Sequence, residues 1–291
     1  MTKKEMSNFK TVTTAEHKLF DLHLKETFKY RDLIMLFVKR NFIADYKQTI
    51  LGPLWAIINP LFNTFVFALV FGELAGLTTA DIPGDYLVPS FLFYLSGNIC
   101  WSYFSTTLNQ TSNTFIQNSG TMGKVYYPRL VAPVSTAISG LISFGIQIVM
   151  FFIVWGYYLI AGGTSIVATP RLLLLPLCVI QMMISATGFG IIISALTTKY
   201  RDLVKLVSLL LAVWRYFSPV AYGLQLVPEK YQFVYMLNPF SSIVTSFRYF
   251  VFGFGYFDIV TYLISWAVSI ALFFVGLILF SRIERTFMDT I

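Results

Sequence analysis

Hydrophobic residues in this chain come in long stretches that charged residues do not interrupt. After Lys47 the next charged residue is Glu73, and several other apolar stretches also reach the ~20 residues that a helix needs to cross a membrane. We expect membrane-spanning helices at six places: 51–72, 87–108, 133–160, 171–197, 203–222 and 258–280. The pattern therefore predicts an all-α polytopic membrane protein with six transmembrane helices.

One apolar stretch, at residues 237–256, is not counted among these spans. A complete crossing there would place Arg282 and Arg285 opposite the other basic residues, and the stretch itself carries Arg248. We expect residues 224–256 to form a re-entrant extracytoplasmic helical hairpin between spans five and six, because irregular backbone at membrane depth is tolerated where protein buries it. A pair of helices lying on the membrane surface is the alternative.

The first fifty residues form a separate region. Residues 1–15 predict a polar tail, residues 16–50 a cytoplasmic amphipathic interfacial helix, and residues 51–291 the transmembrane domain. Lys39 and Lys47 fall away from the apolar face, as a helix on an anionic membrane surface requires. An anchoring helix with no role in substrate binding is the alternative. The apolar side chains at helical spacing are Ile34, Phe37, Val38 and Phe42.

Composition and charge agree with this class. Charged residues make up 12% of the chain, about half the ~25% of a typical soluble domain. With six spans, 17 of the 21 Lys and Arg residues fall on one side of the membrane. Because basic residues concentrate on the cytoplasmic side, both termini are expected in the cytoplasm. No short apolar stretch with a cleavage site precedes the first span, so no removable signal peptide is expected.

Motifs of enzymes and of ion-coupled carriers are missing from the sequence. The nearest approach to a phosphate-binding loop, at residues 120–125, has its glycines too close together and Val125 at the metal-binding position. His17 and His23 are the only histidines, and no spacing is typical of a metal site. We expect no catalytic residue, no metal and no cofactor in this chain. A transferase acting on polyprenyl-linked sugars is a distant alternative, with two aspartates at 81–85 as its only candidate pair.

Aromatic residues are the excess chemistry, with 29 Phe, 17 Tyr and 5 Trp. Most suit the lipid-facing and interfacial positions of any membrane protein. Those at the start of the first span and the end of the fifth could also stack on the apolar faces of sugar rings and hydrogen-bond their hydroxyls. The candidate substrate-channel aromatics are Trp55, Trp214, Tyr216, Phe217 and Tyr222.

Two further features bear on transport. Arg215 is the costliest residue in any span, and charges at such depth tend to face the bundle interior or water. It is a candidate pathway charge for an anionic or hydroxyl-rich substrate, or else a side chain that snorkels outward to helix carbonyls. The cytoplasmic loop at 109–132 is too long for a tight turn, and Asn113 to Lys124 predict a short helix in it, with a solvated loop as the alternative.

Four stretches together resemble the membrane subunits of ABC transporters that export bacterial polysaccharides such as O-antigen, capsule and teichoic acid. The resemblance covers nearly the whole chain, and its motifs are specific as a set. They are the stretch from RDLIMLF to FALVFG at 31–72, YYPRLVAP at 126–133, the stretch beginning KYRDLVK at 199–231, and LNPFSSIVTSFRY at 237–249.

The resemblance implies a homodimer in the bacterial cytoplasmic (inner) membrane, paired with two copies of an ABC ATPase that binds ATP and magnesium. The implied substrate is a polyprenyl-pyrophosphate-linked polysaccharide, O-antigen first, with teichoic acid, capsule or a smaller hydrophobic molecule as alternatives. Membrane lipids are expected partners and nucleic acid is not. Cations stabilise phosphate, so the implied pyrophosphate or gate contacts are Lys39, Arg40 and Lys47. The implied ATPase-coupling residues are Asn113, Phe115, Lys124, Tyr127 and Arg129.

Overall fold

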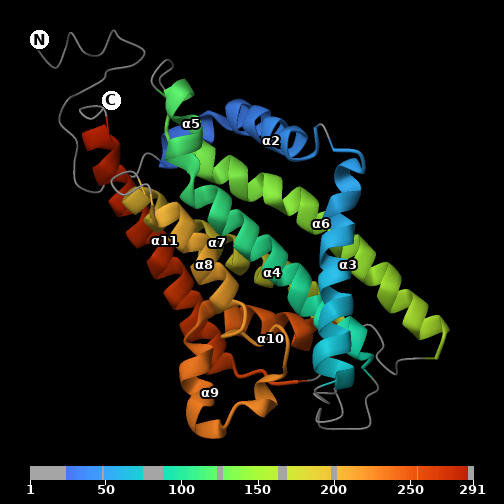
Figure 1. The fold of residues 1–291 in the computed structure, drawn as a ribbon. Helices are drawn as coiled ribbons and strands as arrows, with labels where there is room; N and C mark the ends of the chain where they lie inside the picture. The colour runs from blue at the N-terminus through green and yellow to red at the C-terminus, as the bar shows by residue number, and fades with distance from the viewer. Residues whose placement is uncertain are drawn as a thin grey trace, which may run out of the picture.

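The fold is a bundle of long tilted helices. The computed structural model describes residues 24–47, 49–74, 88–122, 127–162, 169–197, 202–253 and 255–287. Within these ranges every regular element is helical, so the all-α prediction is confirmed. Figure 1 shows α2 and α5 at one end of the bundle and α9 and α10 at the other. The expected polar tail and the first residues of the expected interfacial helix lie outside the described ranges.

Each of the six expected spans contains a helix, although the fifth ends at Trp214 instead of 222. The long helices are α3 (Trp55–Phe67, continued by the π-helical η3 at Ala68–Leu74), α4 (Ser90–Ser112), α6 (Val131–Ile160), α7 (Leu175–Thr197, preceded by η5 at Pro170–Leu174) and α11 (Ile259–Phe287). The shorter elements are α1 (Leu24–Lys29), α2 (Arg31–Tyr46), η2 (Gly52–Leu54), α5 (Thr114–Met122), α8 (Leu203–Trp214), η6 (Leu224–Leu226), α9 (Glu229–Met236) and α10 (Pro239–Phe252).

Membrane crossing is supported most directly for four segments. In the described part of the chain, the segments both long and apolar enough to cross are Gly52–Leu74, Val131–Ile160, Pro170–Thr197 and Ile259–Ser281. The 23-residue α4 is also long enough at ~1.5 Å per residue, but it carries more polar residues and lies largely buried. The 12 residues of α8 extend only ~18 Å, less than the ~30 Å hydrocarbon core. The count of six spans stays a prediction.

A proline inside α3 is accommodated by a side chain from α6. Pro60 has no N–H, so the carbonyl of Ala56 loses its helical hydrogen bond. The Nε2 of Gln147 donates to that carbonyl at 3.1 Å, and Gln147 is buried. The hydroxyl of Thr64 donates to the carbonyl of Pro60 at 2.6 Å. In hydrocarbon no water is available to satisfy a carbonyl that has lost its helical partner. The hydrogen bond from Gln147 to the carbonyl of Ala56 therefore ties α6 to α3.

Small and hydroxyl residues hold α7 against α11. Gln181 donates to Ser265 at 2.8 Å, and one helical turn further Ser185 and Ser269 share a 2.7 Å hydrogen bond. At Gly188 an added Cβ would lie 2.8 Å from the backbone nitrogen of Phe273. Without a hydrophobic force between helices in lipid, close backbone packing and interhelical hydrogen bonds stabilise such pairs.

The segment expected as a hairpin is a pair of helices, α9 and α10. The side chain of Asn238 accepts a hydrogen bond from the backbone N–H of Phe240, Pro239 follows at the first helical position, and Gly253 ends α10 with φ +81°. In α10 every residue except Tyr249 is buried, whereas α9 is mostly exposed. If α10 lay on the membrane surface, one side of this helix would be exposed, and the burial of α10 does not agree with that alternative. That the hairpin re-enters the membrane stays a prediction.

Candidate substrate pathway and coupling site

Arg215 lies just after the last residue of α8, among polar groups of two other helices. Its Nη2 donates to the Oδ1 of Asn98 on α4 at 2.6 Å, and its Nη1 lies 3.4 Å from the Oδ1 of Asn63 on α3. The guanidinium also stands over the ring of Phe67, 4.4 Å from its centroid. No ion pair involves Arg215 among the residues that the structure describes. The described groups that bind this cation, two asparagine amides and an aromatic ring, are therefore all neutral.

The asparagine partners are themselves held in place. The amide of Asn98 donates to the hydroxyl of Thr64 at 3.0 Å, and that hydroxyl donates to the carbonyl of Pro60. The Nε of Arg215 is buried and has no hydrogen-bond partner among the residues with described positions. The side chain thus keeps one unused N–H donor beside a preorganised polar cluster. Sequence reasoning singled out Arg215 but missed Asn63 and Asn98; an asparagine in an otherwise apolar helix is the signal that could have found them.

The candidate channel aromatics divide into two groups. Trp214 is half-buried and packs edge-on against Phe104 and Phe189, with ring centroids 5.4 and 5.0 Å away. Tyr216 and Phe217 are 59% and 63% exposed. Trp214 therefore contributes to the core of its own chain, whereas the next two rings are free to meet another molecule.

The two remaining aromatics lie at opposite ends of the bundle. Trp55 begins α3 and is partly exposed. The hydroxyl of Tyr222 donates to the carbonyl of Tyr216 at 3.0 Å and also contacts the hydroxyl of Tyr235 on α9. Tyr222 thus fixes the turn that carries the exposed rings of Tyr216 and Phe217. The structure brings this turn close to Arg215 but does not bring Trp55 to it.

Arg248 of α10 holds that turn from inside the protein. Its Nη1 and Nη2 donate to the carbonyls of Pro219 and Val220 at 2.6 and 2.9 Å. Its Nε donates to Ser96 of α4 at 3.1 Å, and the guanidinium lies 3.7 Å from the ring centroid of Phe93. Sequence reasoning used Arg248 only against a seventh span. A buried arginine bound by neutral carbonyls is a structural anchor for the turn after α8.

At the other end of the bundle, α2 packs on the protein through the face that its periodicity predicts. Ile34, Phe37 and Val38 are buried. Lys39 and Lys47 are exposed. Neither cation forms an ion pair in the ranges that the structure describes, and the buried face joins α2 to the bundle core.

Arg40, the third candidate phosphate contact, is bound within the chain. Its Nη2 donates to the Oδ1 of Asn118 on α5 at 3.0 Å, and its guanidinium lies 4.3 Å from the ring centroid of Phe37. The structure therefore places Arg40 between α2 and α5. Its Nε also donates to the Oδ1 of Asn41. Arg40 thus has fewer N–H donors left for a phosphate than an arginine without such bonds.

The short helix expected in the loop after α4 is present as α5. Phe115 is fully buried and stacks on Phe280 of α11, with centroids 4.5 Å apart. Asn113 is the C-terminal cap of α4. Residues 123–126, with the candidate Lys124, lie outside the described ranges. The helix is thus attached to α4 by sequence and to α11 by this aromatic stack.

The end of this loop is buried beneath α2. Tyr127 meets Phe37 edge-on at 5.6 Å, and Arg129 is buried. Burial raises the pKa of the Tyr127 hydroxyl above its ordinary value, which Arg40 and Arg129 partly oppose. The phenol is therefore neutral at physiological pH. Of the candidate coupling residues, Asn113 and Phe115 thus lie at the start of α5, whereas Tyr127 and Arg129 lie in the buried segment after it. Their contact with an ATPase stays a prediction.

The known proteins to which this chain is similar are membrane transport proteins. Residues 32–252 match the family model described as ABC-2 type transporter. The O-antigen export system permease protein RfbA of Klebsiella pneumoniae is 28% identical over 265 residues, 89% of this chain and 94% of that protein. A protein of the same name from Myxococcus xanthus is 26% identical over 270 residues, 92% and 98%. The polysialic acid transport protein KpsM of Escherichia coli is 26% identical over 206 residues, 68% and 72%.

The fold agrees with this similarity, because the family match begins in α2 and ends with α10, and so covers all but the last of the long helices. It includes the Arg215 cluster, the anchored turn and the helix α5. Since the match spans well over half of the sequence, the chain belongs to the ABC-2 type transporter family of membrane proteins.

Proposed function

We propose that this chain is the membrane subunit of an ATP-driven exporter that moves a lipid-linked polysaccharide, O-antigen in the first place. The observation that carries the substrate class is the turn after α8, where Arg215 has no ion-pair partner among the described residues and Tyr216 and Phe217 expose their rings. A sugar chain offers hydroxyls to such a cation and apolar faces to such rings. End-to-end similarity to O-antigen export permeases supports the same assignment.

The channel would form between two copies of the chain. Exposed apolar residues are frequent on α3 and α8, among them Phe62, Phe65, Leu209 and Leu210. The 12-residue α8 is too short to cross a membrane alone, so its pathway face needs cover from another element. A homodimer that joins these faces would surround the two Arg215 clusters and line the path with Tyr216 and Phe217.

Energy would come from a separate ATPase that binds ATP and magnesium. Its closure would push α5, and Phe115 would pass the displacement to α11 through the stack with Phe280. The exposed Lys39 of α2, and Lys47 just after this helix, would meet the pyrophosphate of a polyprenyl-linked glycan at the same end of the molecule. The basic α2 end would then face the cytoplasm of a bacterial inner membrane, together with both termini.

Co-purification and export together test this proposal. The tagged chain is purified from its native membrane in mild detergent, and a cytoplasmic ATPase is expected at a one-to-one ratio. Surface polysaccharide is then measured in cells lacking the chain, and its loss with accumulation of lipid-linked glycan inside the cell is the expected result. Recovery of the chain alone after mild crosslinking, or unchanged surface polysaccharide in the deletion strain, contradicts the proposal.

The similarity to a polysialic acid transport protein favours capsule as the second candidate substrate. Polysialic acid carries a carboxylate on each sugar, which Arg215 would attract. The composition of the glycan that accumulates in the deletion strain separates the two: capsular sugars would replace O-antigen sugars in the lipid-linked pool.

A further inference from the structure

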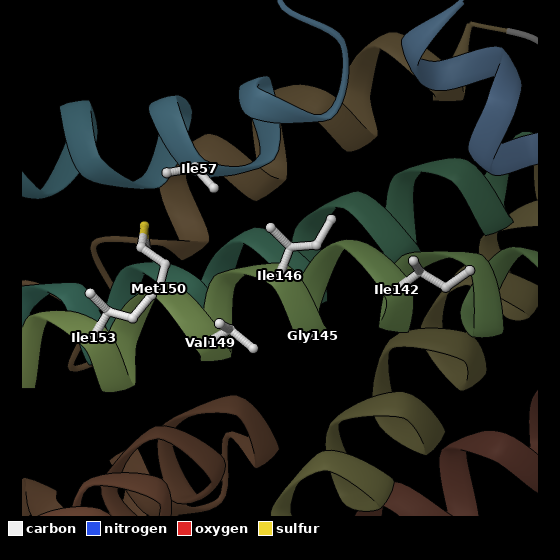
Figure 2. A pocket seen from close by; sticks show the side chains of 7 residues that line it. All are labelled: Ile57, Ile142, Gly145, Ile146, Val149, Met150 and Ile153. Atoms are coloured by element: carbon white, nitrogen blue, oxygen red, sulfur yellow. The ribbon is translucent and has the colours of Figure 1, made fainter.

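An apolar groove runs along α6 beside α3, away from the Arg215 cluster. This open groove has a volume of about 480 Å³ and is lined by Ile57 of α3 and by six residues of α6: Ile142, Gly145, Ile146, Val149, Met150 and Ile153. Figure 2 shows Ile146 and Met150 pointing from α6 toward Ile57, with Ile142 and Ile153 at the two ends. From Ile142 to Ile153 the helix rises ~16 Å, about half the hydrocarbon core.

Gly145 leaves the groove open near its middle, because an added Cβ at this position would meet no atom within 4 Å. The branched side chains of Ile142, Ile146 and Val149 line the groove on either side of the glycine. The lining thus combines a glycine with methyl-rich walls.

One end of the groove lies under the end of α2. The hydroxyl of Tyr46 and the hydroxyl of Ser143, next to Ile142, share a hydrogen bond of 2.9 Å. The following residue, Lys47, is exposed. The carboxylate of Asp45, two residues earlier, is also exposed, and it forms no ion pair with Lys47 among the described residues. Lys47, which forms no ion pair within the described part of the chain, thus follows directly on the residue that joins α2 to this end of the groove.

We propose that this groove seats the isoprenoid tail of the lipid-linked substrate while Lys47 binds its phosphate. The proposal rests on the proposed function and adds a place for the tail. A cation above an apolar groove complements an anionic head on a hydrocarbon chain. Because membrane lipid is as apolar as the groove, burial alone cannot favour one chain over another. Selection comes from the fit of methyl branches between isoleucine side chains and from the charge of the head.

The test uses the complex of this chain with its ATPase in nanodiscs of phosphatidylethanolamine and phosphatidylglycerol. The probe is a polyprenyl phosphate that carries a diazirine in its second isoprene unit, and mass spectrometry locates the adducts after illumination. We expect adducts on α6 between Ile142 and Ile153. Unlabelled polyprenyl phosphate should compete with the probe, and an equal concentration of phosphatidylglycerol should not.

Two glycines of α6 offer a matched pair of variants. Gly145→Phe fills the groove, whereas Gly156→Phe places the same side chain on the same helix outside the groove lining, and neither new Cβ meets an atom within 4 Å. We expect Gly145→Phe to lower labelling roughly tenfold, the scale on which shape discriminates in apolar pockets. Gly156→Phe should label as the unmodified protein does.

A second pair tests the head group. Lys47→Gln should weaken competition by polyprenyl phosphate and leave competition by the uncharged polyprenol unchanged. Lys230→Gln, at an exposed position on α9 at the other end of the bundle, should change neither. Loss of both competitions in Lys47→Gln would indicate a general disturbance and would overturn the assignment of Lys47.

Equal labelling of the two glycine variants, or equal competition by phosphatidylglycerol, would overturn the groove as an isoprenoid site and make it a seat for ordinary lipid. These outcomes are separate from those of the proposed function. A complex that retains its ATPase and exports glycan, but whose Gly145→Phe variant labels and exports normally, contradicts only this inference. A chain that binds no ATPase contradicts the proposed function whatever the groove holds.

Discussion

Replacing Arg248 by methionine removes the anchor of the turn that carries the exposed aromatic rings. Methionine keeps an unbranched side chain but supplies no donor. The guanidinium donates to the carbonyls of Pro219 and Val220 at 2.6 and 2.9 Å, and to those of Tyr222 and Phe93 at 3.3 Å. The variant leaves these buried acceptors without this donor.

The two short bonds set the size of the effect. A buried acceptor that loses its donor costs ~1–3 kcal/mol, so two of them amount to ~2–6 kcal/mol. Removing the buried cation also removes part of its desolvation cost, which lowers the expected net loss to ~2–4 kcal/mol. For a chain of roughly this size, ~2–4 °C per kcal/mol places the unfolding midpoint ~4–16 °C lower.

The two cysteines of the chain provide the assay. Cys100 and Cys178 are both buried, so a thiol-reactive fluorescent dye reports their exposure as the protein unfolds in detergent. Lys230→Met is the control, because Lys230 is exposed and its ammonium stands 5.7 Å from the ring centroid of Tyr231, a contact that contributes ~0.5–1 kcal/mol. If the two variants unfold at the same temperature, the anchoring argument for Arg248 is wrong.

Three further outcomes are expected. Gln147→Leu leaves the carbonyl of Ala56 unsatisfied and should cost ~1–3 kcal/mol in the same dye assay; in a Pro60→Ala background, where the helix regains its own N–H donor, the same change should cost much less, and an equal cost in both backgrounds would refute the explanation. Arg215→Met should lower export roughly 10–100-fold, the rate equivalent of losing a charge-assisted hydrogen bond of ~1.5–3 kcal/mol, without loss of the ATPase from the purified complex; export at the unmodified rate would remove Arg215 from the pathway. Hydrogen bonds from the N–H groups of Thr261 and Val260 hold the pKa of Asp258 below its ordinary value, so its ionised form stabilises the fold above the unfolded pKa of ~3.9 and this is lost as pH falls through the lower folded pKa; Asp258→Asn should therefore unfold earlier than the unmodified chain at pH 6, with a difference that shrinks as the pH is lowered below the unfolded pKa, and a difference that stays constant as the pH falls would contradict this account.

Several local features of the fold follow from sequence because their causes are local. The periodicity of Ile34, Phe37 and Val38 identifies the buried face of α2, and the order Asn238, Pro239 and Gly253 marks both ends of α10. The long apolar stretches contain the helices expected there. Capping groups and hydrophobic spacing act within a few residues, so they can be recognised without knowing the rest of the chain.

The site was less accessible to sequence reasoning. Arg215 was identified because a charge in an apolar stretch is unusual, but its partners Asn63 and Asn98 come from two other helices more than one hundred residues away in sequence. Trp214 and Phe217 looked alike in sequence, yet one packs in the core and the other is exposed. Which way a ring faces depends on the neighbouring helices, and no local pattern encodes that.

The amino-acid sequence is enough to establish the membrane class, the all-helical architecture and the apolar segments, because the absence of water in hydrocarbon forces long uncharged stretches into helices whatever their neighbours are. How these helices satisfy their polar groups depends instead on the packing of the folded chain. It assigned Gln147 to the carbonyl released by Pro60, Arg248 to the turn after α8, and Arg40 to Asn118. Hydrogen bonds form between groups that packing brings within about 3 Å, and that packing is a property of the whole bundle.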